Sequence, residues 1–234
     1  MHYLCRVDRV AAITGGAGAI GGAIATSLRD AGHAVAILDR EAEFAVDLAS
    51  EEAARAAADQ VLERMGRCDV LVHAAAAFDR AALDTLDVKT WRRVQAVNVE
   101  SALWLAQAFV PGMARRGFGR IVMIVSDTVF NPPAPDLLPY VASKAALIGV
   151  ARSLARSLGS SHITVKCGAP GLTRTPAAEA GMPEIAFEQV RAQQALARTL
   201  VPEDVSGVVA FLASDAAAAI TGQTLCADGG LVLR

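Results

Sequence analysis

Residues 10–22 read VAAITGGAGAIGG, and this stretch decides the fold. The apolar run at 10–13 has the length of a buried strand, and a helical pattern follows at 20–30. Closely spaced glycines stand between them. They allow the backbone N–H groups of a turn to approach an anion, while the helix that follows supplies positive potential at its first turn. The stretch therefore predicts a strand, a pyrophosphate-binding turn and a helix.

Short apolar runs and longer helical patterns alternate along the rest of the chain, which is typical of β-α-β units with a parallel sheet. No linker or internal repeat divides the chain. We therefore expect one α/β domain over residues 1–234, a doubly wound Rossmann-type fold with a parallel sheet flanked by helices. Further strands are expected at 34–38, 44–46, 70–73, 120–125, 164–168 and 223–227. Further helices are expected at 50–65, 139–158 and 202–214, and one or two helices at 88–116.

The composition excludes several classes of protein. Of the 234 residues 53% are apolar and 20% are charged, with a net charge of -2, which argues against disorder and against a basic nucleic-acid scaffold. The uncharged run at 10–28 approaches the length of a membrane span, but its glycines suit a turn better. The cysteines (Cys5, Cys68, Cys167 and Cys226) are too widely spaced for a zinc site or a small disulfide framework. We expect no metal and a cytoplasmic protein.

An acidic residue ends the second expected strand, at Asp39. A carboxylate at this point can accept both hydrogen bonds from an adenosine ribose, and it repels a 2′-phosphate. The expected cofactor is therefore NAD rather than NADP. Two alternatives remain: Asp39 could cap a loop, and Arg40 beside it could pair with a 2′-phosphate.

The chain contains only three lysines and two tyrosines, and one of each lies four residues apart in the sequence YVASK, as Tyr140 and Lys144. That spacing places both side chains on one helix face. A free phenol ionises near about pH 10, so it is a poor acid or base at neutral pH unless a cation stabilises the phenolate. The pair is thus a candidate for proton transfer, although an exposed surface pair would have the same spacing.

Two polar residues could complete such a site. Ser126 follows the strand expected at 120–125, where a parallel sheet places ligands, and its hydroxyl can donate to a substrate oxygen. Asn98 interrupts an apolar stretch inside an expected helix. Its amide could satisfy a local backbone group, or it could break the helix and hold a water.

These residues together resemble the short-chain dehydrogenases/reductases of ordinary length, over nearly the whole chain. The glycine turn resembles the family's T-G-x-x-x-G-x-G, and Tyr140 with Lys144 its Y-x-x-x-K. The resemblance implies hydride transfer between nicotinamide and a carbinol carbon. In it Tyr140 is the acid or base, Lys144 lowers the pKa of the phenol, Ser126 orients the substrate oxygen, and Asn98 holds a relay water. It also implies a homotetramer.

The same resemblance implies which residues contact the cofactor. They follow the expected strands and the catalytic helix: Gly15, Gly18, Ile20, Gly21, Asp39, Asp47, Leu48, Ala75, Ala76, Asn98, Tyr140, Lys144, Gly171, Thr173 and Thr175.

The chain departs from the family after the fourth expected strand. The family usually has N-N-A-G there, whereas this chain has His73-Ala74-Ala75-Ala76. The missing asparagine is expected to remove a hydrogen bond that ties neighbouring strands, and the missing glycine adds a methyl group where adenosine packs. His73 is interpreted as a packed residue rather than as an acid or base.

The substrate is less clearly indicated. Asp127 after Ser126, with the short connection after the second strand, is similar to 2,3-dihydro-2,3-dihydroxybenzoate dehydrogenases and related diol dehydrogenases. We therefore expect a secondary alcohol or cyclic diol and its ketone. Apolar residues expected to border the pocket are Phe130, Leu137, Leu138, Met182 and Phe187.

Two other functions remain open at this point. One is a 3-oxoacyl-acyl-carrier-protein-type ketoreductase, whose docking patch could be supplied by Arg115, Arg116 and Arg120. The other is a non-catalytic nucleotide-sensing protein on the same fold, suggested by the altered segment at 73–76.

Overall fold

The sheet consists of strands that are apolar on both faces. All five residues of β1 (Val10–Thr14) are buried, as in parallel strands that are covered by helices on both sides. The computed structural model describes residues 9–233. Within them one parallel sheet has seven strands in the order β3-β2-β1-β4-β5-β6-β7. The other strands are β2 (Ala34–Asp39), β3 (Phe44–Ala45), β4 (Val70–His73), β5 (Gly119–Ile124), β6 (Ile163–Pro170) and β7 (Thr224–Ala227).

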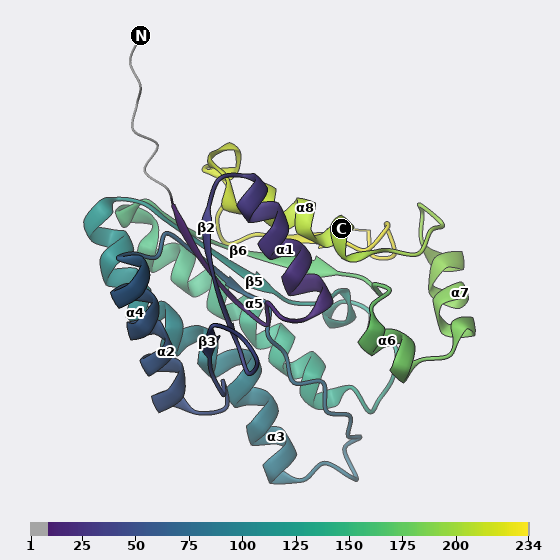
Figure 1. Cartoon of the computed structure of the whole chain (residues 1–234). Coiled ribbons are helices and arrows are strands. Elements are labelled where there is room, and N and C mark those ends of the chain that lie inside the picture. The colour runs from purple at the N-terminus through teal and green to yellow at the C-terminus, as the bar shows by residue number, and fades with distance from the viewer. Residues whose placement is uncertain (1–8, 234) are drawn as a thin grey trace.

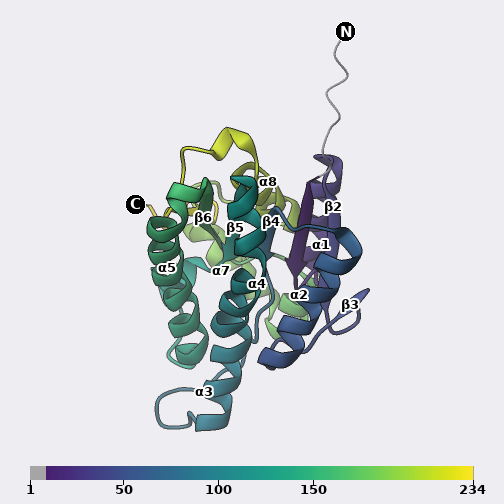
Figure 2. The same ribbon diagram turned by 90° about the vertical axis from the view of Figure 1, so that its left-hand side faces the viewer.

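Helices cover both faces of this sheet (Figures 1 and 2). On one face, Ile24 and Leu28 pack in the same apolar cluster as Val205 and Val209. On the other face, a larger cluster joins the sheet to residues such as Val61. The first face carries α1 (Ala19–Asp30) and α8 (Pro202–Ala213), and the second carries α2 (Glu51–Met65), α4 (Ser101–Arg116) and α5 (Leu138–Leu158).

The region at 88–116, where one or two helices were expected, consists of three consecutive helical segments. α3 (Val88–Gln95) is followed by the π-helix η1 (Ala96–Glu100), and α4 then begins at Ser101. The π-helical turn widens the helix around Asn98, and such turns are frequent at functional sites. Short 3₁₀ turns lie elsewhere, at η2 (Asp127–Val129), η3 (Gly159–Ser161) and η4 (Asp215–Ala217).

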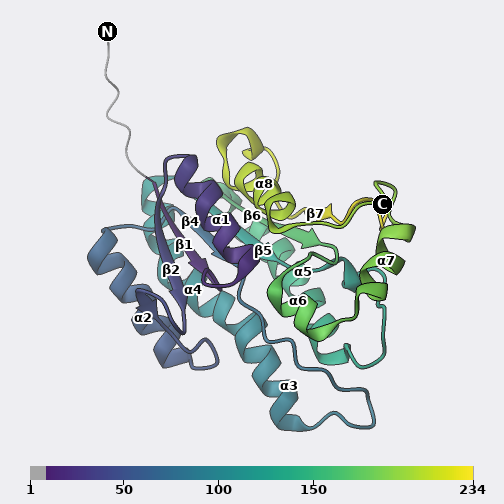
Figure 3. The same cartoon turned by 45° about the vertical axis from the view of Figure 1, so that its right-hand side comes forward.

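Two helices lie where none was predicted. α6 (Pro176–Gly181) and α7 (Glu184–Gln193) follow β6 and lie to one side of the sheet (Figure 3). Phe187 is the one buried residue in them. Neither helix therefore carries the apolar stripe by which an amphipathic helix is recognised in a sequence.

The predicted α/β class and the parallel sheet are confirmed, with strand limits within two residues of the prediction. By length and composition alone, the segment Pro135–Ser161 could cross a membrane. Its helix α5 instead buries Leu147 and Ala151 against the sheet, as a core helix does. Cys5 and the ends of the predicted domain lie outside the described residues.

Candidate active site

The sequence-predicted residues converge because the sheet is parallel. The carboxyl ends of its strands all lie on one edge, and each predicted group follows one of these ends. After β1 come Gly15, Gly18, Ile20 and Gly21; at or after β2 and β3, Asp39, Asp47 and Leu48; after β4, Ala75 and Ala76; after β5, Ser126; and after β6, Gly171, Thr173 and Thr175.

The glycine turn is packed too tightly for side chains. Gly15 has a φ of +70°, and a Cβ there would lie 2.7 Å from the Ala75 nitrogen. A Cβ on Gly21 would lie 2.1 Å from the Gly15 carbonyl oxygen. Gly18 then stands at the N-cap of α1, where it offers no side-chain hydrogen bond. The turn thus brings bare backbone to a helix N-terminus, which is the donor arrangement that a dinucleotide pyrophosphate requires.

Asp39 reaches from the end of β2 to this turn. Its Oδ2 accepts a hydrogen bond from the Ala17 backbone nitrogen at 3.1 Å, and its Oδ1 accepts one from the Arg40 nitrogen at 2.7 Å. The carboxylate is therefore fixed beside the turn, and each oxygen keeps a lone pair for a further donor.

Tyr140, Ser126 and Lys144 lie together beyond β5. Tyr140 is in the first turn of α5, and the Lys144 Nζ lies 5.6 Å from the centre of its ring. Lys144 is fully buried and donates to the carbonyl oxygen of Ile124 at 2.7 Å. Ser126 caps η2 and accepts from the Thr128 nitrogen at 3.2 Å. A phenol, an alcohol and an ammonium thus occupy one end of the sheet.

Desolvation acts on both members of the tyrosine–lysine pair. Burial raises the pKa of Tyr140 to about 12, while the neighbouring Ser126 hydroxyl works in the opposite direction. Burial also lowers the pKa of Lys144 to about 8. Without further charge stabilisation, the phenol keeps its proton at neutral pH. That Lys144 lowers the pKa of the phenol stays a prediction.

Phe78 is a site neighbour that sequence reasoning missed. Its ring meets the Tyr140 ring edge to face with centroids 4.6 Å apart, and 47% of Phe78 remains exposed. A lone phenylalanine in the loop after β4 carries no periodic signal, so only the fold could reveal this contact. Among the residues expected to border the pocket, Leu137 and Phe187 are buried, Leu138 is exposed, and Phe130 and Met182 are partly buried.

Asn98 uses its side chain to hold the protein together. Its Oδ1 accepts from the Ala77 nitrogen at 2.6 Å, and its Nδ2 donates to the Ala77 carbonyl at 3.0 Å and to the Ser143 hydroxyl at 2.9 Å. Ser143 in turn donates to the Tyr140 carbonyl oxygen at 2.7 Å. The amide therefore links the loop after β4 to the first turn of α5.

Comparisons with known proteins identify the family. Residues 15–232 match the family model described as enoyl-(acyl carrier protein) reductase. The chain is 34% identical to the "Probable galactose dehydrogenase GalD" of Rhizobium meliloti (strain 1021), over 96% of this chain and 95% of that protein. The chain belongs to the short-chain dehydrogenase/reductase family. It is therefore an oxidoreductase of alcohols and ketones, in a family that generally uses nicotinamide cofactors.

Two further proteins are similar to this short-chain dehydrogenase/reductase over nearly their whole length. The cis-4-hydroxycyclohexanecarboxylate dehydrogenase of Sinomonas cyclohexanicum is 34% identical, over 95% of this chain and 96% of that protein. The structure of the TT0495 protein from Thermus thermophilus superposes with a TM-score of 0.89 at 35% identity, over 95% of this chain and 98% of that one.

His73 replaces the family's asparagine and still makes hydrogen bonds, contrary to our expectation of a lost tie between strands. Its Nε2 lies 3.0 Å from the Asn98 carbonyl oxygen, and its Nδ1 lies 3.0 Å from the Thr14 hydroxyl. A carbonyl can only accept, so Nε2 carries the proton and Nδ1 accepts from Thr14. The same Thr14 oxygen accepts from the Ala74 and Ala75 nitrogens, each at 3.1 Å. His73 therefore joins β1 to the π-helical turn.

Burial and the charge of Lys144 lower the pKa of His73 to about 3. The imidazole is thus neutral at ordinary pH, which agrees with its interpretation as a packed residue.

Asp127 is an unusual group for the interior of this site. It is 5% exposed, and burial together with the like charge of Asp228 raises its pKa to about 6. Its Oδ1 accepts from the Ser126 hydroxyl at 3.3 Å. The chain therefore places a titrating carboxyl directly beside the family's serine.

The loop after β6 lies close to that carboxyl. A Cβ on Gly171 would lie 3.2 Å from the Asp127 Oδ2. The Thr173 hydroxyl donates to the Gly171 carbonyl at 3.0 Å, and Thr175 caps α6 by accepting from the Ala178 nitrogen. The structure thus orders both threonines, and their contact with a cofactor stays a prediction.

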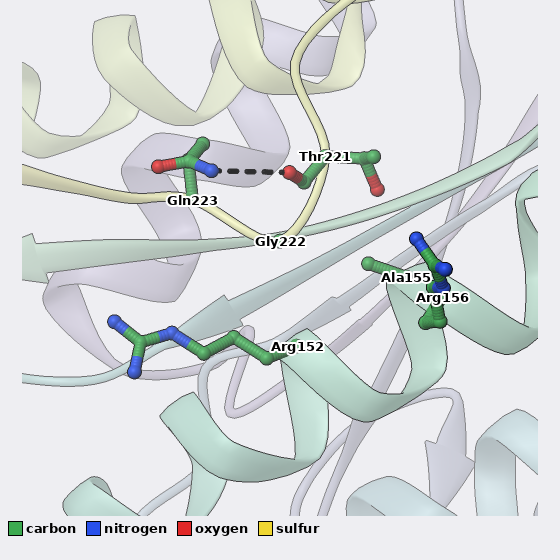
Figure 4. A pocket seen from close by; sticks show the side chains of 6 residues that line it. All are labelled: Arg152, Ala155, Arg156, Thr221, Gly222 and Gln223. Carbon is green, nitrogen blue, oxygen red and sulfur yellow. Dashed lines mark hydrogen bonds between the residues drawn. The ribbon is translucent and has the colours of Figure 1, made fainter.

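A shallow surface hollow lies away from this site. It is bordered by the exposed Arg152 and Arg156 of α5 and by the loop before β7, where Gln223 donates to the Thr221 carbonyl (Figure 4). Arg152 is twelve residues beyond Tyr140, which is about 18 Å along a helix. The hollow is therefore separate from the proposed chemistry.

Replacement of His73 by asparagine should destabilise the protein at about pH 8 by about 2–4 kcal/mol, because it leaves a cavity and unpaired polar groups. The lowered pKa of His73 makes its contribution fall as pH drops below about 6.5, where the unfolded chain takes up a proton and the folded one does not. Urea unfolding should thus show a mutant deficit that shrinks by up to about 1.4 kcal/mol per pH unit. A deficit independent of pH would contradict the neutral, buried imidazole.

Asp127→Asn should have the opposite pH dependence. The raised pKa of Asp127 means that the ionised form is penalised in the folded state above about pH 6, and that the penalty disappears below about pH 4. The variant should therefore be more stable than the parent by about 1–3 kcal/mol at pH 8, with no difference at pH 4. Equal stability at both pH values would show that Asp127 is ordinarily solvated.

Proposed function

We propose that the protein interconverts a secondary alcohol, or a cyclic diol, and its ketone with NAD as the cofactor. In the oxidation direction, the carbinol C–H bond breaks as a hydride leaves, and the hydroxyl proton passes to the Tyr140 phenolate. In reduction, Tyr140 returns this proton to the oxygen. NAD, when bound, supplies the hydride acceptor, and NADH supplies the donor.

The arrangement of Tyr140, Ser126 and Lys144 is the observation that supports this proposal. The three polar groups stand at the carboxyl end of the sheet, on the same edge as the glycine turn. A ligand bound along that edge can reach both the turn and the phenol. The residues of the turn fit a dinucleotide, because a Cβ at Gly15 or Gly21 would fill the space that bare backbone leaves open.

Each residue has one task in this proposal. Ser126 orients the substrate oxygen towards the phenol. Lys144 stabilises the phenolate and offsets the desolvation that raises the pKa of Tyr140. The Asn98 side chain is already bonded to Ala77 and Ser143, so a relay water would bind its backbone carbonyl, beside the His73 proton.

Asp39 supports NAD rather than NADP. Its carboxylate is held beside the glycine turn and can accept from the two ribose hydroxyls, whereas a 2′-phosphate would meet like charge. Arg40, the residue that could offset this repulsion, is exposed on the following turn.

The alternative of an acyl-carrier-protein ketoreductase is weakened, because two of its three docking arginines are engaged within the protein while Arg115 stays exposed. Arg116 is bound to Asp69 and to the Cys68 carbonyl, and Arg120 is buried against Asp215. By contrast, the relatives named for galactose and for cis-4-hydroxycyclohexanecarboxylate are named for small hydroxylated molecules. We therefore favour a small free alcohol.

The proposed assembly is a homotetramer in the cytoplasm. α5 leaves Ala145, Ala146 and Gly149 exposed on its outer side, and such small side chains permit close packing of a second helix. This surface supports association between copies through α5.

Lys144→Met should lower turnover by about a hundredfold to ten-thousandfold, because the cation that stabilises the phenolate is lost while the apolar stem is kept. The test follows nicotinamide absorbance with a panel of secondary alcohols and diols. Lys166→Met is a matched control. Lys166 is also fully buried, donates to a carbonyl at 2.7 Å and has a pKa lowered to about 8, but it contacts α8 instead. Equal losses in both variants would sink the assignment of Lys144.

Initial rates with NADH and NADPH at equal concentration should favour NADH strongly. Asp39→Ser should narrow that preference by about tenfold or more, because it removes both the ribose acceptor and the like charge. Arg40→Gln serves as the control and should leave the preference unchanged. A parent enzyme that prefers NADPH would overturn the role given to Asp39.

A further inference from the structure

The carboxyl group of Asp127 has no cation to neutralise it. Within residues 9–233 no salt bridge reaches it, and the charge that acts on its pKa is the like charge of Asp228. A buried carboxylate is costly unless donors satisfy its lone pairs. The Ser126 hydroxyl donates at a long 3.3 Å, and the backbone N–H groups of Thr128 and Asp127 lower the pKa further without offsetting the cost of burial.

Asp228 has a structural task that Asp127 lacks. Its two oxygens accept from the Gly230 nitrogen at 3.0 Å and from the Val232 nitrogen at 2.8 Å, and they fix the turn after β7. By contrast, the donors that act on the Asp127 carboxyl come from its own turn: the Ser126 hydroxyl and the backbone N–H groups of Asp127 and Thr128. Its Oδ2 faces the Gly171 backbone, where a side chain would crowd it. The Asp127 carboxyl therefore ties no distant segment in place, although its burial is costly.

We infer that Asp127 binds a second hydroxyl of the substrate, on the carbon beside the one that is oxidised, so that the substrates are vicinal diols and the matching α-hydroxyketones. This inference rests on the proposed function, because it places the reacting oxygen at Ser126 and Tyr140.

The spacing of the two side chains carries the inference. Ser126 Oγ and Asp127 Oδ1 lie 3.3 Å apart, so they form two adjacent hydrogen-bonding groups. Two oxygens on adjacent carbons have a similar separation, so one can accept from Ser126 while the other donates to Asp127. When the second hydroxyl donates to Asp127, it replaces the hydrogen bond from Ser126. The Ser126 hydroxyl can then donate to the reacting oxygen instead.

A hydroxyl can bind this carboxyl in either of its protonation states. It can donate to the ionised form or accept from the protonated form. An ammonium has no lone pair, so it would bind the ionised form alone.

The test compares cyclohexane-1,2-diol with cyclohexanol as substrates of the same enzyme sample. The ratio of the two kcat/KM values does not change if part of a variant fails to fold. The parent should prefer the diol by about tenfold or more, as expected for a hydrogen bond to a charged group. Asp127→Leu should abolish this preference, mainly through a higher KM for the diol, and Asp127→Asn should retain part of it.

Asp59→Asn is the control for loss of an acidic side chain, because Asp59 is exposed on α2 and should leave the ratio unchanged. Three results would overturn the inference: equal preference in the parent, an equal loss of both activities in Asp127→Leu, or a parent preference for 2-aminocyclohexanol over the diol. An equal loss would make Asp127 a support for Ser126 alone. Absence of turnover with every alcohol and ketone would instead refute the proposed function itself.

Discussion

The site depends on one buried chain of hydrogen bonds that runs from the glycine turn to the catalytic helix. Thr14 donates to His73, His73 donates to the Asn98 carbonyl, and Asn98 donates to Ser143. All four residues are fully buried. In a low-dielectric interior, each missing partner would leave a costly unpaired group. This hydrogen-bond network is therefore stable only when all four residues are in place. Ser143 lies between Tyr140 and Lys144, and the geometry of the phenol is thus tied to the turn that begins at Gly15.

This chain of bonds explains why the site can be rigid although its parts are far apart in sequence. β1 and β4 are adjacent strands, and His73 is the last residue of β4, directly opposite Thr14. The π-helical turn at η1 brings the Asn98 backbone within reach of the imidazole and its side chain within reach of α5. An ordinary α-helical turn would give Asn98 a different backbone path. The local departure from regular helix is therefore part of how the site is held.

Much of the fold could be predicted from sequence, because the strands are continuous apolar runs and Gly15 to Gly22 mark a turn that few other structures require. Tyr140 and Lys144 could also be predicted as candidate site residues, because their spacing alone places them on one helix face. What could not be predicted depends on contacts between distant segments. Nothing local indicates that His73 bonds to Thr14 and Asn98. The contact between Phe78 and Tyr140, and the helices α6 and α7, likewise become evident only in the fold.

The central claim is that the neutral His73 links the strand before the glycine turn to the catalytic helix through Asn98. ¹⁵N NMR of the histidine side chains tests it directly. Comparison with His73→Asn assigns the His73 signals. The structure predicts an imidazole with its proton on Nε2 that does not titrate between about pH 8 and pH 5, as burial and Lys144 require. An imidazolium that forms near the ordinary histidine pKa of about 6.5, or a proton on Nδ1, would contradict the account.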